Sequence, residues 1–147
     1  LRVRGSAEAL LAEKFSVRAI VQAQHTDSPL LSYEQLPIGN LTIGRGYDPA
    51  SISGDKGIAA AFEARFGPFR PTPSIPVQAY AFYDVAHVEA LGLGALEADV
   101  ASVGGGFRMN LTPRLNLDVA YAHPLDEPFT GFGEPDDRLL VSLTANF

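Results

Sequence analysis

The sequence contains no cysteine among its 147 residues. This absence excludes disulfides, zinc sites built on thiolates and a cysteine nucleophile. Long apolar runs are also missing, because no window reaches the roughly 18 consecutive apolar residues that a membrane-spanning helix requires. A formal net charge of −6, with scattered arginines, argues against nucleic acid as a partner. The strongest remaining signal is the alternation of apolar and polar residues.

This alternation has a period of two and recurs in about six segments of about ten residues, the length of tilted membrane-spanning strands. The segments cover residues 15–24, 58–66, 77–85, 103–111, 115–122 and 138–147. We therefore predict an all-β fold of antiparallel strands. The preceding stretch, Ala7 to Glu13, is expected to form a brief helical turn.

A soluble β-sandwich and a membrane β-barrel both produce such alternation. Here the charged residues fall on the polar faces of the segments, and the apolar faces carry no charge, as contact with lipid requires. The charged residues are Arg18, Glu63, Arg65, Asp84, Arg108 and Asp118. The distribution favours an antiparallel transmembrane β-barrel, of which residues 1–147 are expected to be the C-terminal part, with no other domain.

The connectors and the chain end agree with a barrel. Residues 112–114 read as a tight turn, whereas residues 25–56 and 123–136 are long and rich in Gly, Pro and Asp. Short turns on one rim and long loops on the other are typical of outer-membrane barrels. Residues 67–76 are expected to form a Pro-rich connector. The terminal Phe147 resembles the C-terminal signal for insertion of these barrels.

The connector 25–56 is far longer than the few residues that usually join two strands. It contains LSYEQLPIGN at residues 31–40, TIGRGYD at residues 42–48 and ISGDKG at residues 52–57. Glycines on both sides of Arg45 permit a tight excursion that projects the guanidinium at its tip. A loop of this length is expected to be functional or disordered.

The order of these motifs resembles the two-partner secretion transporters, the haemolysin secretion/activation (ShlB/FhaC/HecB) family, although Gly44 stands where that family usually has valine. The resemblance implies that the loop folds into the barrel lumen, where Arg45 pairs with an inner-wall aspartate of an FxDxG motif. The segment from Phe82 to Ala86 matches that motif with Ala86 in place of the glycine. The expected pair is therefore Arg45 with Asp84.

A bidentate pair suits an arginine inside a barrel, because it offsets desolvation better than a lysine contact would. The resemblance therefore implies a latch that holds the loop, and no catalytic residue. The expected loop motif and latch comprise Arg45, Gly46, Tyr47, Phe82 and Asp84, and the supporting glycines are Gly39, Gly44, Gly54 and Gly57. No metal or cofactor is expected, since His25, His87 and His123 lack metal-ligand spacing.

The resemblance implies that the protein translocates a secreted partner polypeptide across the outer membrane of a Gram-negative bacterium, in contact with outer-membrane lipid. Periplasmic POTRA domains are expected in a missing N-terminal part. An assembly factor for outer-membrane proteins, from the same superfamily, is an alternative, and a soluble β-sandwich binding module is another. A hydrolase is a more remote alternative, and its residues would be Ser51, Ser53, His25 and Asp55, which share one loop.

Overall fold

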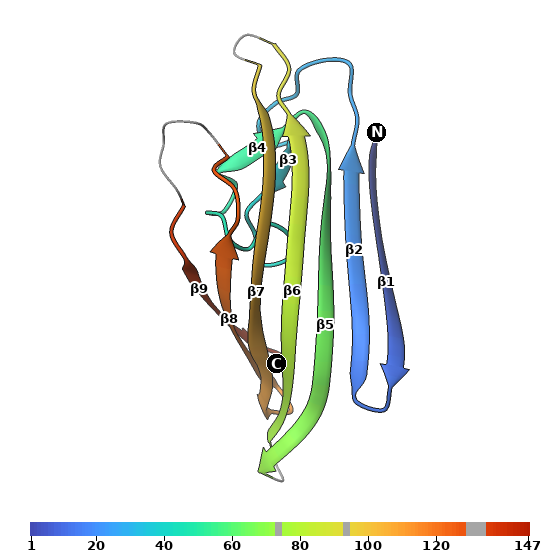
Figure 1. The fold of residues 1–147 in the computed structure, drawn as a ribbon, viewed down its shortest axis with the longest axis vertical. Helices are drawn as coiled ribbons and strands as arrows, with labels where there is room; N and C mark the ends of the chain where they lie inside the picture. The colour runs from blue at the N-terminus through green and yellow to red at the C-terminus, as the bar shows by residue number, and fades with distance from the viewer. Residues whose placement is uncertain (73–74, 93–94, 129–134) are drawn as a thin grey trace.

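The computed structural model describes residues 1–72, 75–92, 95–128 and 135–147. Its main element is an antiparallel sheet of seven strands in the order β1-β2-β5-β6-β7-β8-β9 (Figure 1). Two short strands, β3 and β4, follow β2 and precede β5 in the sequence, and they pair with each other in a separate small sheet. The prediction of an all-β, antiparallel fold is confirmed. The strands are β1 Arg2–Ala12, β2 Phe15–Gln24, β3 Leu36–Ile38, β4 Ile52–Gly54, β5 Lys56–Thr72, β6 Ile75–Glu89, β7 Glu97–Thr112, β8 Leu115–Pro124 and β9 Arg138–Ala145.

The described residues include no helix, so none of them forms a helix long and apolar enough to cross a membrane. The prediction of a helical turn from Ala7 to Glu13 is wrong, because β1 occupies this stretch as far as Ala12. It pairs with β2 from Arg2 opposite Gln24 to Ala12 opposite Phe15. The hydrogen bonds of this ladder outweigh the helix propensity of alanine, leucine and glutamate. The sheet therefore has one strand more than the predicted six.

The prediction of a connector over residues 67–76 is also wrong. Strand β5 continues to Thr72 and β6 begins at Ile75. The register between these strands shifts on both sides of Phe69, and such irregularities tolerate proline in a sheet. Residues 73–74 of the predicted connector, and residues 129–134 of the long connector before β9, lie outside the described residues.

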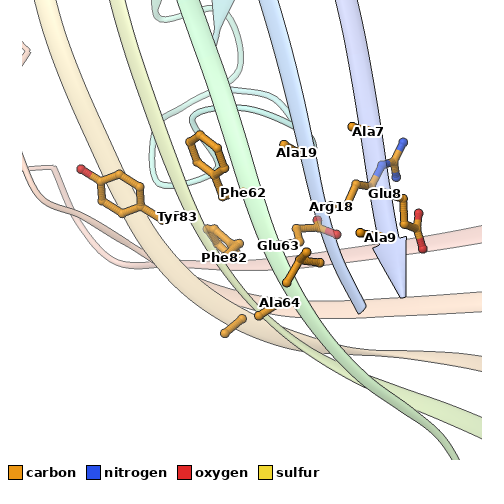
Figure 2. A pocket seen from close by; sticks show the side chains of 12 residues that line it. Ala7, Glu8, Ala9, Arg18, Ala19, Phe62, Glu63, Ala64, Phe82 and Tyr83 are labelled. Carbon is orange, nitrogen blue, oxygen red and sulfur yellow. The ribbon is translucent and has the colours of Figure 1, made fainter. Parts of the chain in front are cut away.

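One face of the sheet is apolar and uncharged along the middle of its strands. Phe62, Tyr83 and Val103 lie side by side in one row across β5, β6 and β7. Each of them is 40–48% exposed. A hollow in this face is lined by small side chains, such as Ala19 and Ala64, beside the rings of Phe62 and Tyr83 (Figure 2). Soluble monomers rarely expose so broad an apolar surface.

The opposite face, which we call the inner face, is covered by the connector of residues 25–55, which we call the inner loop. This loop carries β3 and β4 and lies behind the upper half of the sheet in Figure 1. Small residues of the inner face leave room for the bulkier residues of the loop. The shared core joins Leu36, Ile38, Ile43, Tyr47 and Ile52 of the loop to Ile20, Ala59, Ala61, Ala86, Val88, Ala98 and Val100 of the sheet.

Candidate functional site

The side chain of Arg45 is buried between the inner loop and the sheet, with 2% of its surface exposed. Its Nε and Nη2 atoms donate hydrogen bonds to the two carboxylate oxygens of Asp84, at 2.9 and 2.7 Å. The backbone N–H of Arg45 donates to the same carboxylate at 3.0 Å. Asp84 is itself fully buried. The structure thus brings these two residues together as a bidentate, charge-assisted pair.

The alternation of β6 explains how Phe82 and Asp84 reach Arg45 together, since residues two apart on a strand share a face. Asp84 lies opposite Ala61 on β5 and Ser102 on β7, whose small side chains leave space for the loop to approach. The Phe82 ring lies beneath the guanidinium, with Cζ of Arg45 3.5 Å from the ring centroid. A cation–π contact therefore supplements the ion pair.

The glycines on both sides of Arg45 are required by close packing, within the inner loop at Gly44 and between the loop and the sheet at Gly46. Gly44 has a φ of +73°, and a Cβ at this position would lie 2.5 Å from Cγ2 of Ile38. This explains why the larger valine of the family pattern is absent here. A Cβ on Gly46 would lie 2.7 Å from Cβ of Ser102. The three other predicted glycines, Gly39, Gly54 and Gly57, also stand where a Cβ would come within 3.0 Å of neighbouring backbone.

Tyr47, the last residue of the Arg-Gly-Tyr motif, connects the inner loop to the C-terminal strands of the sheet. Its buried hydroxyl donates to the backbone oxygen of Ala101 at 2.8 Å and accepts from the N–H of Asp126 at 3.3 Å. The backbone oxygen of Tyr47 accepts a hydrogen bond from Arg138. The motif therefore contacts β7, β9 and the connector between β8 and β9.

Glu63 is part of this site, although sequence analysis did not assign it a role. Its carboxylate accepts from Nη1 of Arg45 at 2.7 Å, from Nη2 of Arg65 at 2.7 Å and from Nη2 of Arg108 at 3.0 Å. Only 8% of the Glu63 surface is exposed. The available signal was its position on the polar face of the strand beside Asp84. One carboxylate thus bridges three arginines.

The network extends across the inner face beyond Glu63. Nε of Arg108 donates to Asp118 at 2.9 Å, and the hydroxyl of Tyr80 donates to the same carboxylate at 2.6 Å. On the other side, Nη1 of Arg65 donates to Glu8 at 3.0 Å. No buried side-chain nitrogen or oxygen of the described residues lacks a hydrogen-bond partner. A fully satisfied polar network of this kind fixes one arrangement of the strands that contribute to it.

A second buried carboxylate, Asp55, fixes the end of the inner loop with uncharged donors. It accepts hydrogen bonds from the backbone N–H of Leu91 at 2.5 Å, the backbone N–H of Leu30 at 2.8 Å and the amide of Gln35 at 3.0 Å. The Leu91 N–H above all, with those of Leu30 and Gln35, holds the pKa of Asp55 below its ordinary value, against the opposing effect of burial. Asp55 thereby ties the loop to the connector between β6 and β7.

The remaining predicted residues are not brought into this site. Phe147 is fully exposed and follows the end of β9, so its role as an insertion signal stays a prediction. The residues of the hydrolase alternative do not converge. Ser53 donates to Gln35, and His25 pairs with Asp27.

Fold and site together define a class of protein: an antiparallel β-sheet with one uncharged apolar face and, on the other, a loop fixed by buried ion pairs. The model of the family described as haemolysin secretion/activation protein ShlB/FhaC/HecB matches residues 4–109. The chain belongs to this family, whose members are outer-membrane transporters of two-partner secretion. No curated protein and no solved structure gives a significant match.

Proposed function

We propose that residues 1–147 form the C-terminal wall of an outer-membrane β-barrel, and that this barrel translocates a secreted partner polypeptide. The family assignment supports the transport role. The uncharged face suits contact with outer-membrane lipid, and the charged inner face suits a water-filled lumen. In this proposal the POTRA domains belong to the remainder of the full-length protein. A soluble β-sandwich would need a second large sheet over the exposed row of Phe62, Tyr83 and Val103, and the described residues form no such sheet.

The observation that carries the mechanism is the buried fork between Arg45 and Asp84. In this proposal the pair acts as a latch that holds the inner loop in the lumen. Glu63 binds the remaining Nη1 atom of Arg45, so the guanidinium is fixed from two strands, β5 and β6. A fixed guanidinium sets the position of the loop beside the path of the polypeptide. In this proposal, none of these groups reacts with the substrate.

A charge exchange in the full-length protein, expressed with its cognate partner, tests this proposal. The variants are Arg45→Asp, Asp84→Arg and the double exchange, and the readout is secreted partner per folded transporter in the outer membrane. Each single change puts like charges into contact and is expected to abolish secretion. The double exchange is expected to restore only part of it, because the carboxylate introduced at position 45 would still face Glu63.

Arg114→Asp is the matched control, because it makes the same change in the exposed turn between β7 and β8. Its secretion is expected to equal that of the wild type. Normal secretion by both single variants would reject the latch. Normal secretion together with depleted levels of unrelated outer-membrane proteins would instead favour the assembly-factor alternative.

A further inference from the structure

Beyond the apolar band, the outer face of the sheet becomes charged at the upper ends of β6 and β7 in Figure 1. His87 and Glu89 of β6 lie on the same face as the apolar Val85 and are the next two residues of that face. The register sets His87 opposite Asp99 of β7, and Glu89 opposite Glu97. Four polar groups from two consecutive strands therefore meet at one rim of the sheet. None of them belongs to the latch network.

Three of these side chains converge closely enough to hold one metal ion. Single ligand atoms of His87, Glu97 and Asp99 all lie within 4.8 Å of one another. Nδ1 of His87 is 2.9 Å from Oδ1 of Asp99 and 3.9 Å from Oε1 of Glu97. Ligands about 2.1 Å from a tetrahedral ion are about 3.4 Å apart. Small rotations of the two exposed carboxylates would reach that geometry.

The second nitrogen of the imidazole already has an orienting partner. Nε2 of His87 lies 3.4 Å from Oε1 of Glu89, and Oε2 of Glu89 binds Nζ of Lys56 at 2.6 Å. Metal-binding histidines commonly donate their other N–H to a carboxylate in this way. Glu97 stands opposite Glu89, whose charge Lys56 already balances, and brings a further carboxylate to the cluster.

Comparison with the other histidines shows what is special about this cluster. His25 lies 3.5 Å from Asp27, and His123 lies 2.6 Å from Asp137. Each histidine therefore has an aspartate beside it. Among the described residues, a three-ligand group forms only around His87.

We propose that His87, Glu97 and Asp99 form a zinc-type metal site on the outer rim of the sheet, with Glu89 as the orienting partner. Imidazole and carboxylate ligands together suit Zn²⁺, and three protein ligands leave one position for water. The site is independent of the proposed transport function. It bridges β6 and β7 at the base of the connector whose Leu91 N–H binds Asp55. Sequence spacing gave no signal, because cross-strand register brings the ligands together.

The test uses full-length protein in detergent, purified with a tag that lacks histidine and stripped of metal by a chelator. Zn²⁺ binding is followed by calorimetry, and Co²⁺ binding by its visible absorption spectrum. The site is read as the difference between the wild type and His87→Ala. We expect one ion per chain to be lost in His87→Ala, and affinity to fall at least tenfold in Asp99→Asn and Glu97→Gln. Glu89→Gln is expected to weaken binding about 10- to 100-fold.

His123→Ala is the matched control, because it removes an exposed histidine that pairs with a single aspartate. It is expected to bind Zn²⁺ like the wild type. The proposal is overturned if His87→Ala binds as many ions as the wild type, or if His123→Ala loses as much binding. All of these side chains are partly or largely exposed, so circular dichroism of the variants is expected to match the wild type.

Discussion

The inner loop is fixed at two places that use opposite chemistry. In the middle of the loop, the cation of Arg45 is enclosed by the carboxylates of Asp84 and Glu63. At its end, the carboxylate of Asp55 is enclosed by uncharged donors, among them the backbone N–H groups of Leu30 and Leu91. The first contact joins mainly side chains, so a charge exchange can rebuild part of it. The second depends on the path of the backbone, so no exchange of side chains can replace it.

The largest effect is expected from Arg45→Met, which leaves two buried carboxylates without their shared cation. Removing one partner of a buried ion pair costs about 3–5 kcal/mol. Hydrogen exchange at the amides of Arg45 and Gly46 measures this cost as lost protection, because both N–H groups bind the sheet. The protection of these amides in Arg45→Lys is expected to lie between that in Arg45→Met and that in the wild type, since an ammonium cannot reproduce the fork. Unchanged protection in Arg45→Met would show that this anchor does not hold the loop.

Asp55→Asn is expected to have a smaller effect, because no buried charge loses its partner. The asparagine amide turns a donor towards N–H groups that need an acceptor, which costs about 1–3 kcal/mol. Protection of the Leu30 and Leu91 amides should fall, while that of the Arg45 amide changes less. The control is Asp27→Asn, which alters an exposed aspartate of the same loop. An equal loss of amide protection at the Asp55 anchor and at the Arg45 anchor would contradict the view that the two contacts are separate.

The Asp55 anchor should also respond to pH. Its pKa is lower in the folded protein than the ordinary value of about 3.9, so its stabilisation is complete above that value. The stabilisation is lost as the pH falls through the lowered folded pKa. The loss should be smaller than in Asp55→Asn, since a protonated carboxyl still accepts at one oxygen. Exchange at Leu91 measured between neutral and acidic pH tests this, and the asparagine variant should lack this component of the pH response.

Tyr47→Phe is expected to have the smallest effect, because it removes one hydroxyl and leaves both anchors in place. The loss of its hydrogen bonds to Ala101 and Asp126 should cost about 0.5–1.5 kcal/mol. Faster exchange at the Asp126 amide is the measurement. Tyr33→Phe provides the control, since Tyr33 is an exposed tyrosine of the same loop. A loss of amide protection as large as that in Arg45→Met would show that Tyr47 is an equally important anchor of the loop.

Alternation predicted the sheet well, because a strand with two different faces imposes a period of two on the sequence wherever it pairs. Residues 58–66 and 77–85 lie within β5 and β6 as a result. The same rule did not identify β1, whose Ala- and Leu-rich stretch also suits a helix. Its identity as a strand depends on pairing with β2, which propensity does not encode.

The site was harder to predict from the sequence than the fold. Arg45 and Asp84 were expected as a pair through the motifs that resemble those of the family, and alternation assigned Asp84 to the polar face. The link from Arg45 to Glu63 depends on where a long loop settles against the sheet. The cluster around His87 depends in the same way on cross-strand register. Asp55 was noted only within the ISGDKG motif and in the hydrolase alternative, and its anchoring role was not expected because most of its partners are backbone groups, which leave no pattern in the sequence.

The alanines beneath the inner loop have a thermodynamic consequence of their own. Ala59, Ala61 and Ala86 of the sheet share one buried apolar core with Ile38 and Ile52 of the loop. Lifting the loop would wet both surfaces, so the release carries a positive change in heat capacity. Apolar contacts weaken on cooling. The apolar part of the contact between the inner loop and the sheet is therefore expected to contribute less to holding the loop at low temperature.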